Sequence, residues 1–296
     1  MNDTATPSTP LWAGKRLPVV GVTGEFGSGK SLFLLTIDPD CFDREGPPRT
    51  LAWGTEDGLT PYEDSFNFEH RPLTQVMLKP GYKPEDLYVE WLQQMRAVQP
   101  GQFRVGCVDT VTEIEDGLAA WVRQRPEHFG HTRGQYAKME GLYWGDVKSL
   151  WKQHLSEAAA RFECFAFSSH AKSVWRGNEP TRERTAKGKQ TLWELASLYL
   201  WLDRTPKAGS KKAPQKPSGT IFAGKNRLVH LVDGELHPIL PPRLPEATPW
   251  AIRGYILKPA DYDALKTGER APGDEPLTED EKLLAVSYTH LRAHET

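Results

Sequence analysis

The sequence has few cysteines, no long apolar run and little net charge, and these scarcities exclude several classes of protein. Its three cysteines, at 41, 107 and 164, form no C-x-x-C pair, which argues against a disulfide framework or a zinc site and favours reduced thiols in a cytosol. The longest apolar stretch, 195–202, is far shorter than the roughly 20 residues that span a bilayer. The first ten residues lack the pattern of a signal peptide. We therefore expect a cytoplasmic protein with no membrane partner.

The net charge of −2 conceals an uneven distribution of charge along the 296 residues. Between Lys172 and Arg227 there are thirteen Lys/Arg and four Asp/Glu, so this segment carries +9 and the remainder carries −11. A basic block in an otherwise acidic protein is typical of a polyanion partner, although a solvated loop would have the same composition. Hydrophobic residues make up 38% of the chain, which is enough for a sizeable core.

Alternation of short apolar runs with helical periodicity predicts an α/β fold: a mainly parallel central sheet flanked by helices, with an antiparallel extension late in the chain. The expected strands are 17–23, 50–54, 103–108, 162–167, 198–202, 220–223 and 228–232. The expected helices are 30–37, 84–98, 114–122 and 143–160.

The chain divides into a core and three flanking segments. Residues 1–16, rich in Thr and Pro, are expected to be a flexible arm, 17–240 the core, and 241–285 a C-terminal extension of loop and a short helix. The last residues, 286–296, read VSYTHLRAHET and resemble one reading frame of a transposase adapter used in DNA-sequencing libraries. We leave this segment out of the functional reasoning; the alternative is a genuine polar tail.

A glycine-rich segment, GEFGSGKS from Gly24 to Ser31, matches the phosphate-loop pattern G-x-x-x-x-G-K-[ST]. Because an apolar strand precedes it and a helix follows, backbone N–H groups and the helix N-terminus would point at phosphate oxygens. Lys30 would reach the β- and γ-phosphates, and the Ser31 hydroxyl would ligate Mg²⁺; the alternative is a turn that binds nothing. The pattern predicts ATP and Mg²⁺ as cofactors, held by Gly24, Glu25, Phe26, Gly27, Ser28, Gly29, Lys30, Ser31 and Leu32.

Hydrolysis also needs a carboxylate near the metal and a group that positions water. Asp109, at the end of a predicted strand, is the expected Mg²⁺ partner. Glu56 is our candidate for polarising the attacking water, with its neighbour Asp57 as the competitor. His170, in the run SSHAK, would sense the γ-phosphate, unless it has only a local role. All of these groups follow predicted strands, at the edge where open α/β sheets bind ligands.

Two mobile loops are expected in the basic block, at 172–189 and 204–216, and we predict that they contact single-stranded DNA. Lysines and arginines would bind phosphates, and a tryptophan in the first loop would stack on a base; a solvated connection is the alternative, above all for the second loop. The candidate DNA-binding residues are Lys172, Trp175, Arg176, Arg182, Arg184, Lys187, Lys189, Lys207, Lys211 and Lys212.

These motifs together resemble RecA-like P-loop ATPases, and most closely the phage-type AAA-domain nucleotide-binding proteins, which include single-strand-annealing ATPases of bacteriophages. GEFGSGKS is similar to their Walker A loop, CVDT to the Walker B strand and SSHAK to the sensor strand, and WGTEDG is similar to the segment that carries the catalytic glutamate, here Glu56. GKQTLWELASLYLWLDR resembles the segment after a recombinase DNA-binding loop, where lysines can reach a neighbouring subunit's nucleotide. The resemblance implies a homo-oligomer, and it covers about 17–227.

The function favoured by this pattern is an ATPase coupled to DNA, in phage recombination or replication. Two other classes stay open. One is a phosphotransferase that uses the same loop for a small-molecule acceptor, with arginines from HTRGQY or PTRERT as a lid. The other is a nucleotide-dependent interaction switch that does not hydrolyse ATP.

Overall fold

The structure is a computed structural model, and it describes residues 19–176, 179–186, 196–204, 217–226, 229–232, 235–238, 240–249 and 251–252. The expected arm at 1–16 and the adapter-like segment at 286–296 lie outside these ranges. Within them, no helix has both the length and the apolar character needed to cross a membrane.

A single large sheet forms the centre of the described part of the chain. Its eight strands are β1 (Val19–Gly24), β2 (Thr50–Gly54), β3 (Phe68–Pro72), β4 (Val105–Asp109), β5 (Cys164–Ser169), β8 (Leu198–Asp203), β9 (Ser218–Asn226) and β12 (Arg243–Leu244). They lie in the order β12-β9-β8-β1-β5-β4-β2-β3. Neighbours from β8 to β3 are parallel, whereas β9 and β12 add antiparallel pairs. This confirms the expected mainly parallel α/β sheet with a late antiparallel extension.

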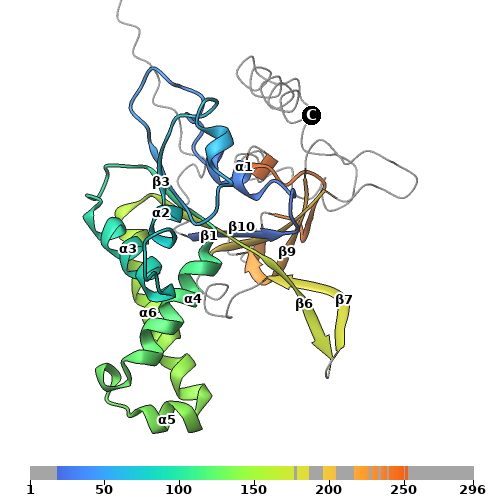
Figure 1. Ribbon diagram of the computed structural model, residues 1–296. Coiled ribbons are helices and arrows are strands. Elements are labelled where there is room, and N and C mark those ends of the chain that lie inside the picture. Colours follow the sequence, from blue (N-terminus) through green and yellow to red (C-terminus); the bar gives the residue numbers. More distant parts are fainter. Residues whose placement is uncertain are drawn as a thin grey trace, which may run out of the picture.

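Helices cover both faces of this sheet (Figure 1). Their bounds are α1 (Lys30–Leu35), α2 (Thr74–Met77), α3 (Pro84–Ala97), α4 (Val111–Gln124), α5 (Arg133–Lys138) and α6 (Glu140–Arg161), with 3-10 turns η1 (Thr60–Tyr62) and η2 (Pro126–Phe129). Helices α3, α4 and α6 pack together on one face, and α1 contacts β1, β4 and β5 from the other.

Alternate residues of the central strands point into two separate hydrophobic cores. In β5, Phe165 and Phe167 join the core under α3, α4 and α6, whereas Cys164 and Ala166 join the core under α1. Because parallel strands with helices on both sides are buried on both faces, their sequences read as continuous apolar runs. This is the physical reason why the central strands could be predicted from the sequence.

Side-chain sizes are closely complementary where β4 faces the core under α3, α4 and α6. A Cβ atom added to Gly106 would lie 2.7–2.8 Å from ring atoms of Phe162, so that ring fills the place of a side chain. Just before the strand, Arg104 donates to Asp38 at 3.2 Å and to Asp40 at 3.3 Å. These contacts account for a glycine and an arginine in a segment that otherwise reads as apolar.

Two small antiparallel hairpins accompany the main sheet. One pairs β6 (Ala171–Arg176) with β7 (Glu179–Ala186), and the other pairs β10 (Val229–Val232) with β11 (Glu235–Pro238). The first corrects the expectation of a mobile loop over 172–189. Its strands adjoin in sequence and form main-chain hydrogen bonds that need no apolar side chains, so its basic composition concealed it. In Figure 1 this hairpin projects away from the main sheet.

Most expected elements occur within a few residues of their predicted bounds. Strand β2 matches the prediction residue for residue, and α4 and α6 are longer than predicted at both ends. Strand β3, α2 and α5 were not predicted. The sheet also continues past residue 240, since β12 pairs with β9 and Leu244, Ala247 and Ile252 are buried.

Candidate functional site

The glycine-rich segment connects β1 to α1 as a tight loop at the carboxyl edge of the sheet. Gly29, the residue before the helix, has φ 92°, a backbone conformation that side chains disfavour. At Gly24 an added Cβ would lie 2.4 Å from the backbone oxygen of Leu202 on β8. Glycine at both positions is therefore required by the fold of the loop itself.

Lys30 begins α1 and folds back over the loop. Its Nζ donates to the backbone oxygens of Gly24 at 3.1 Å and of Glu25 at 3.0 Å. Burial lowers the pKa of the Lys30 ammonium, and the negative charges of Asp109 and Glu56 partly offset this effect. A cation is thus held at the mouth of the loop by acceptors that a phosphate group can replace.

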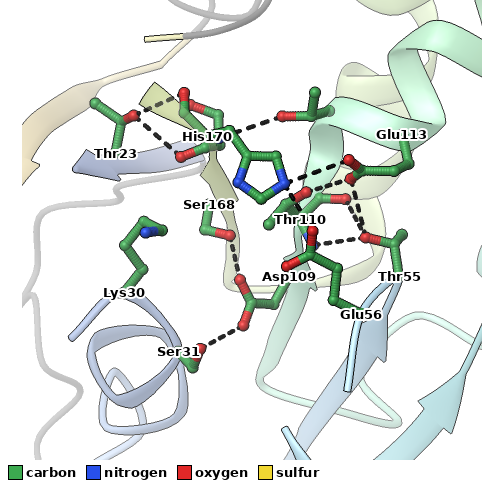
Figure 2. Close-up of polar contacts among 12 residues, drawn as sticks. Thr23, Lys30, Ser31, Thr55, Glu56, Asp109, Thr110, Glu113, Ser168 and His170 are labelled. Carbon is green, nitrogen blue, oxygen red and sulfur yellow. Dashed lines mark hydrogen bonds and ion pairs between the residues drawn. The ribbon is translucent and has the colours of Figure 1, made fainter. Parts of the chain in front are cut away.

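Ser31 and Asp109 meet although 78 residues separate them in sequence. The Ser31 hydroxyl donates to Asp109 Oδ2 at 2.5 Å, and the Ser168 hydroxyl donates to the other carboxylate oxygen, Oδ1 (Figure 2). Asp109 is buried, and the loop after β2 lies next to the pair: a Cβ built on Gly58 would be 3.4 Å from Oδ2 and 3.5 Å from the Ser31 hydroxyl. Hydroxyl and carboxylate oxygens are the ligands that hard divalent cations prefer.

His170 lies between two carboxylates beside this pair. Its Nε2 is 2.7 Å from Glu56 Oε1 and 3.3 Å from Glu113 Oε1. The other oxygen of Glu113 accepts hydrogen bonds from the hydroxyls of Thr55, at 3.2 Å, and Thr110. Figure 2 shows these side chains converging from the ends of β2, β4 and β5 and from the first turn of α4.

The protonation of this cluster follows from its contacts. A hydrogen bond to Glu113 is the largest influence and raises the pKa of His170; burial opposes it, and the charge of Glu56 adds to the increase. For Glu113, burial raises the pKa, but hydrogen bonds from His170 and Thr110 outweigh it and the pKa is lowered. One potential metal-ligand atom from each of Glu56, Glu113 and His170 lies within 4.8 Å of the other two. Because Nε2 faces two carboxylate oxygens, it carries a proton in this arrangement and offers no lone pair to a metal.

The carboxyl end of β5 is anchored so that His170 has a fixed backbone position. The Thr23 hydroxyl donates to the backbone oxygens of Ser169 at 3.0 Å and His170 at 3.2 Å. The His170 N–H donates to the Thr112 hydroxyl at 3.2 Å. Ser169 also bonds the buried hydroxyl of Tyr199 on β8 at 2.9 Å. The backbone of His170 is therefore held in place by contacts from four elements: β1, β5, β8 and α4.

The structure brings together five residues that the sequence selected for the site: Lys30, Ser31, Glu56, Asp109 and His170. Asp57, the competitor of Glu56, instead accepts a hydrogen bond from the Thr60 hydroxyl at 2.6 Å.

The remaining residues selected for nucleotide binding lie in the same loop and the start of α1. Ser28 is buried, whereas the side chain of Phe26 is fully exposed.

Sequence reasoning missed Glu113 and the two threonines that bind it. The signal that could have found Glu113 is its spacing: it follows Asp109 by four residues and directly precedes the predicted helix 114–122. In the structure it lies in the first turn of α4, which starts earlier than predicted. Thr55 could have been found next to Glu56, at the end of its strand. Their convergence, however, depends on the register of β2 against β4.

The candidate DNA-binding residues divide into two groups. The exposed Lys172, together with Trp175 and Arg176, belongs to β6, and Arg182 and Arg184 belong to β7. The other candidates lie outside the described residues: Lys187, Lys189, Lys207, Lys211 and Lys212. Strand β6 starts immediately after His170, so the hairpin is joined directly to the site.

Comparison with known proteins adds no assignment. No protein-family model matches the chain, and no curated protein sequence is significantly similar to it.

Proposed function

We propose that this protein is a Mg²⁺-dependent, ATP-hydrolysing P-loop protein of RecA-like fold that is coupled to DNA. The observation that carries the proposal is the contact between Ser31 of the phosphate loop and Asp109 at the end of β4. A glycine-rich turn that bound nothing would need no lysine over its mouth and no buried carboxylate against its serine. The strand order β8-β1-β5-β4-β2 is compatible with the expected fold, and it supports the proposal without being specific to it.

The proposed nucleotide site uses the loop and the two residues that follow it. Loop N–H groups and the start of α1 would bind the phosphates of ATP, and Lys30 would exchange its bonds to Gly24 and Glu25 for phosphate oxygens. Ser31 and Asp109 fit Mg²⁺ because they bring a hydroxyl and a carboxylate oxygen together, 2.5 Å apart, and oxygen atoms are the ligands that Mg²⁺ prefers. When bound, Mg²⁺ neutralises charge that develops on the phosphates.

We assign hydrolysis to Glu56 and His170, which lie beside the proposed nucleotide site. Glu56 is half exposed at the end of β2, where its carboxylate would accept a proton from the attacking water. His170, with its raised pKa, would donate to the γ-phosphate. Asp57 is the weaker candidate, since its carboxylate is engaged with Thr60.

The coupling to DNA rests on the basic block and on the β6–β7 hairpin. This hairpin carries Lys172, Arg176, Arg182 and Arg184 and begins at the residue after His170. Single-stranded DNA is the proposed partner, because a segment rich in lysine and arginine that also contains a tryptophan has the residue types that bind phosphates and unpaired bases. A homo-oligomer and a cytoplasmic location remain part of this proposal.

A turnover assay tests the proposal. ATP hydrolysis is measured with Mg²⁺ or with EDTA, in the presence and absence of single-stranded DNA. We expect Mg²⁺-dependent turnover that DNA stimulates. Transfer of the phosphoryl group to a small acceptor would favour a phosphotransferase, and tight binding without turnover would favour a switch. Absence of both binding and turnover would refute the proposal.

A further inference from the structure

Glu113 is the acidic neighbour of His170 to which the proposed reaction assigns no role. Its side chain is only 23% exposed, and three groups define its orientation. The hydroxyls of Thr55 and Thr110 bind one carboxylate oxygen, and His170 lies 3.3 Å from the other. This carboxylate is therefore fixed in place before any ligand arrives.

A conflict arises at Glu56, the proposed general base. Its Oε1 is 2.7 Å from His170 Nε2, so it accepts a charge-assisted hydrogen bond. That bond occupies Oε1, one of the two carboxylate oxygens of the proposed base. For Oε1 to take a proton from water, Glu56 must give the bond up, and the half-buried imidazole N–H then depends on Glu113, 3.3 Å away, as its acceptor. Without that acceptor, the loss of the hydrogen bond would be costly.

We infer that Glu113 is a positioning residue for the proposed hydrolysis: it accepts the hydrogen bond from the His170 Nε2–H group when Glu56 turns to the attacking water. This inference rests on the proposed function. Nε2 already lies between the two carboxylates, so a small rotation of the imidazole strengthens one bond as it weakens the other. Glu113 thereby lowers the free energy needed to release Glu56.

The groups around His170 are consistent with two interchangeable acceptors. Glu56 faces it from the loop after β2 and Glu113 from α4, and these two carboxylates are the charged groups that affect its pKa. Although Glu56 is nearer, the more buried Glu113 has the larger effect on that pKa. The backbone N–H of His170 is bound separately by Thr112, so the imidazole can turn while the main chain stays in place.

Kinetics test the role of Glu113 in turnover. Glu113→Gln should lower kcat about tenfold, the effect of weakening one hydrogen bond to a charged group, and leave KM for ATP within about twofold. Asp116→Asn, which removes an exposed charge from the same helix, is the matched control and should leave both unchanged. In a His170→Asn background, Glu113→Gln should cause no further decrease. Equal decreases in both backgrounds would show a merely structural role and overturn the inference.

Titration of the His170 imidazole by NMR tests the two acceptors without nucleotide or turnover, and His170→Asn identifies the signal. We expect a raised pKa in the wild type and in Glu56→Gln, where Glu113 takes over the bond, and an ordinary pKa only when both glutamates are replaced. An ordinary pKa in Glu56→Gln alone would overturn the inference. A wild-type protein that does not hydrolyse ATP would refute the proposed function, and this titration would still decide whether Glu113 is an acceptor.

Discussion

Replacement of Glu56 by glutamine should separate the proposed nucleotide binding from the proposed hydrolysis. The amide keeps the shape of the side chain but is a poor base, and positioned general bases contribute roughly 10²- to 10⁴-fold to a rate. We therefore expect turnover to fall by at least about a hundredfold, or roughly 3 kcal/mol in the barrier. ATP should bind equally well or more tightly, because a carboxylate that repels the γ-phosphate is gone.

Folding should be little affected by the same change. The Glu56 side chain is 49% exposed, and an ion pair of that kind contributes about 1 kcal/mol or less to the free energy of unfolding. Turnover, binding of a non-hydrolysable ATP analogue and thermal unfolding should be measured together. Asp57→Asn is the matched control, since it removes the adjacent carboxylate that binds Thr60. If Asp57→Asn is inactive while Glu56→Gln is active, the assignment of the base is wrong.

Three further predictions concern the core, the pH dependence and the hairpin. Gly106→Ala should destabilise the fold by about 1–3 kcal/mol in chemical denaturation, because the Phe162 ring must move, whereas Gly145→Ala, in open space on α6, should not destabilise it. Burial lowers the pKa of His154 to about 4, so as the pH falls the unfolded chain binds a proton before the folded protein does. The free energy of unfolding should therefore decrease from about pH 6.5 down to 4. His154→Gln should remove up to about 3 kcal/mol of this pH dependence, and an unchanged pH profile of stability would contradict the prediction. Replacing the basic residues of β6 and β7 with serine should weaken binding of single-stranded DNA. The slope of log affinity against log salt concentration should become shallower by about 0.7 for each phosphate that is no longer bound. Unchanged affinity would count against the DNA partner.

The parts of the site that could be predicted depend on local sequence. A loop that wraps a phosphate needs glycine at fixed spacing, with lysine and serine directly after it, so the segment from Gly24 to Ser31 is recognisable without a fold. The placement of Glu56, Asp109 and His170 followed from one further rule, that the ends of parallel strands share an edge. The structure places all three side chains at that edge.

The parts that could not be predicted depend on contacts between distant residues. Strand β3, FEHRP, has no apolar alternation and forms by parallel pairing with β2. The β6–β7 hairpin has the composition of a solvated loop, yet it is held by main-chain pairing. Glu113 reaches His170 only because α4 begins directly after β4, beside the end of β5. In each case the contact is made with a residue or strand outside the element concerned, so the sequence of that element alone does not predict it.

Calorimetric titration of ATP into the protein tests the central claim most directly. Wild-type protein should bind ATP in the presence of Mg²⁺ and much more weakly in EDTA. Lys30→Ala, which removes the cation held over the loop, should weaken binding at least about tenfold, and Lys79→Ala, at an exposed lysine distant in sequence, should leave it unchanged. Binding that is equal in wild type and Lys30→Ala, or no binding by the wild type, would contradict the account.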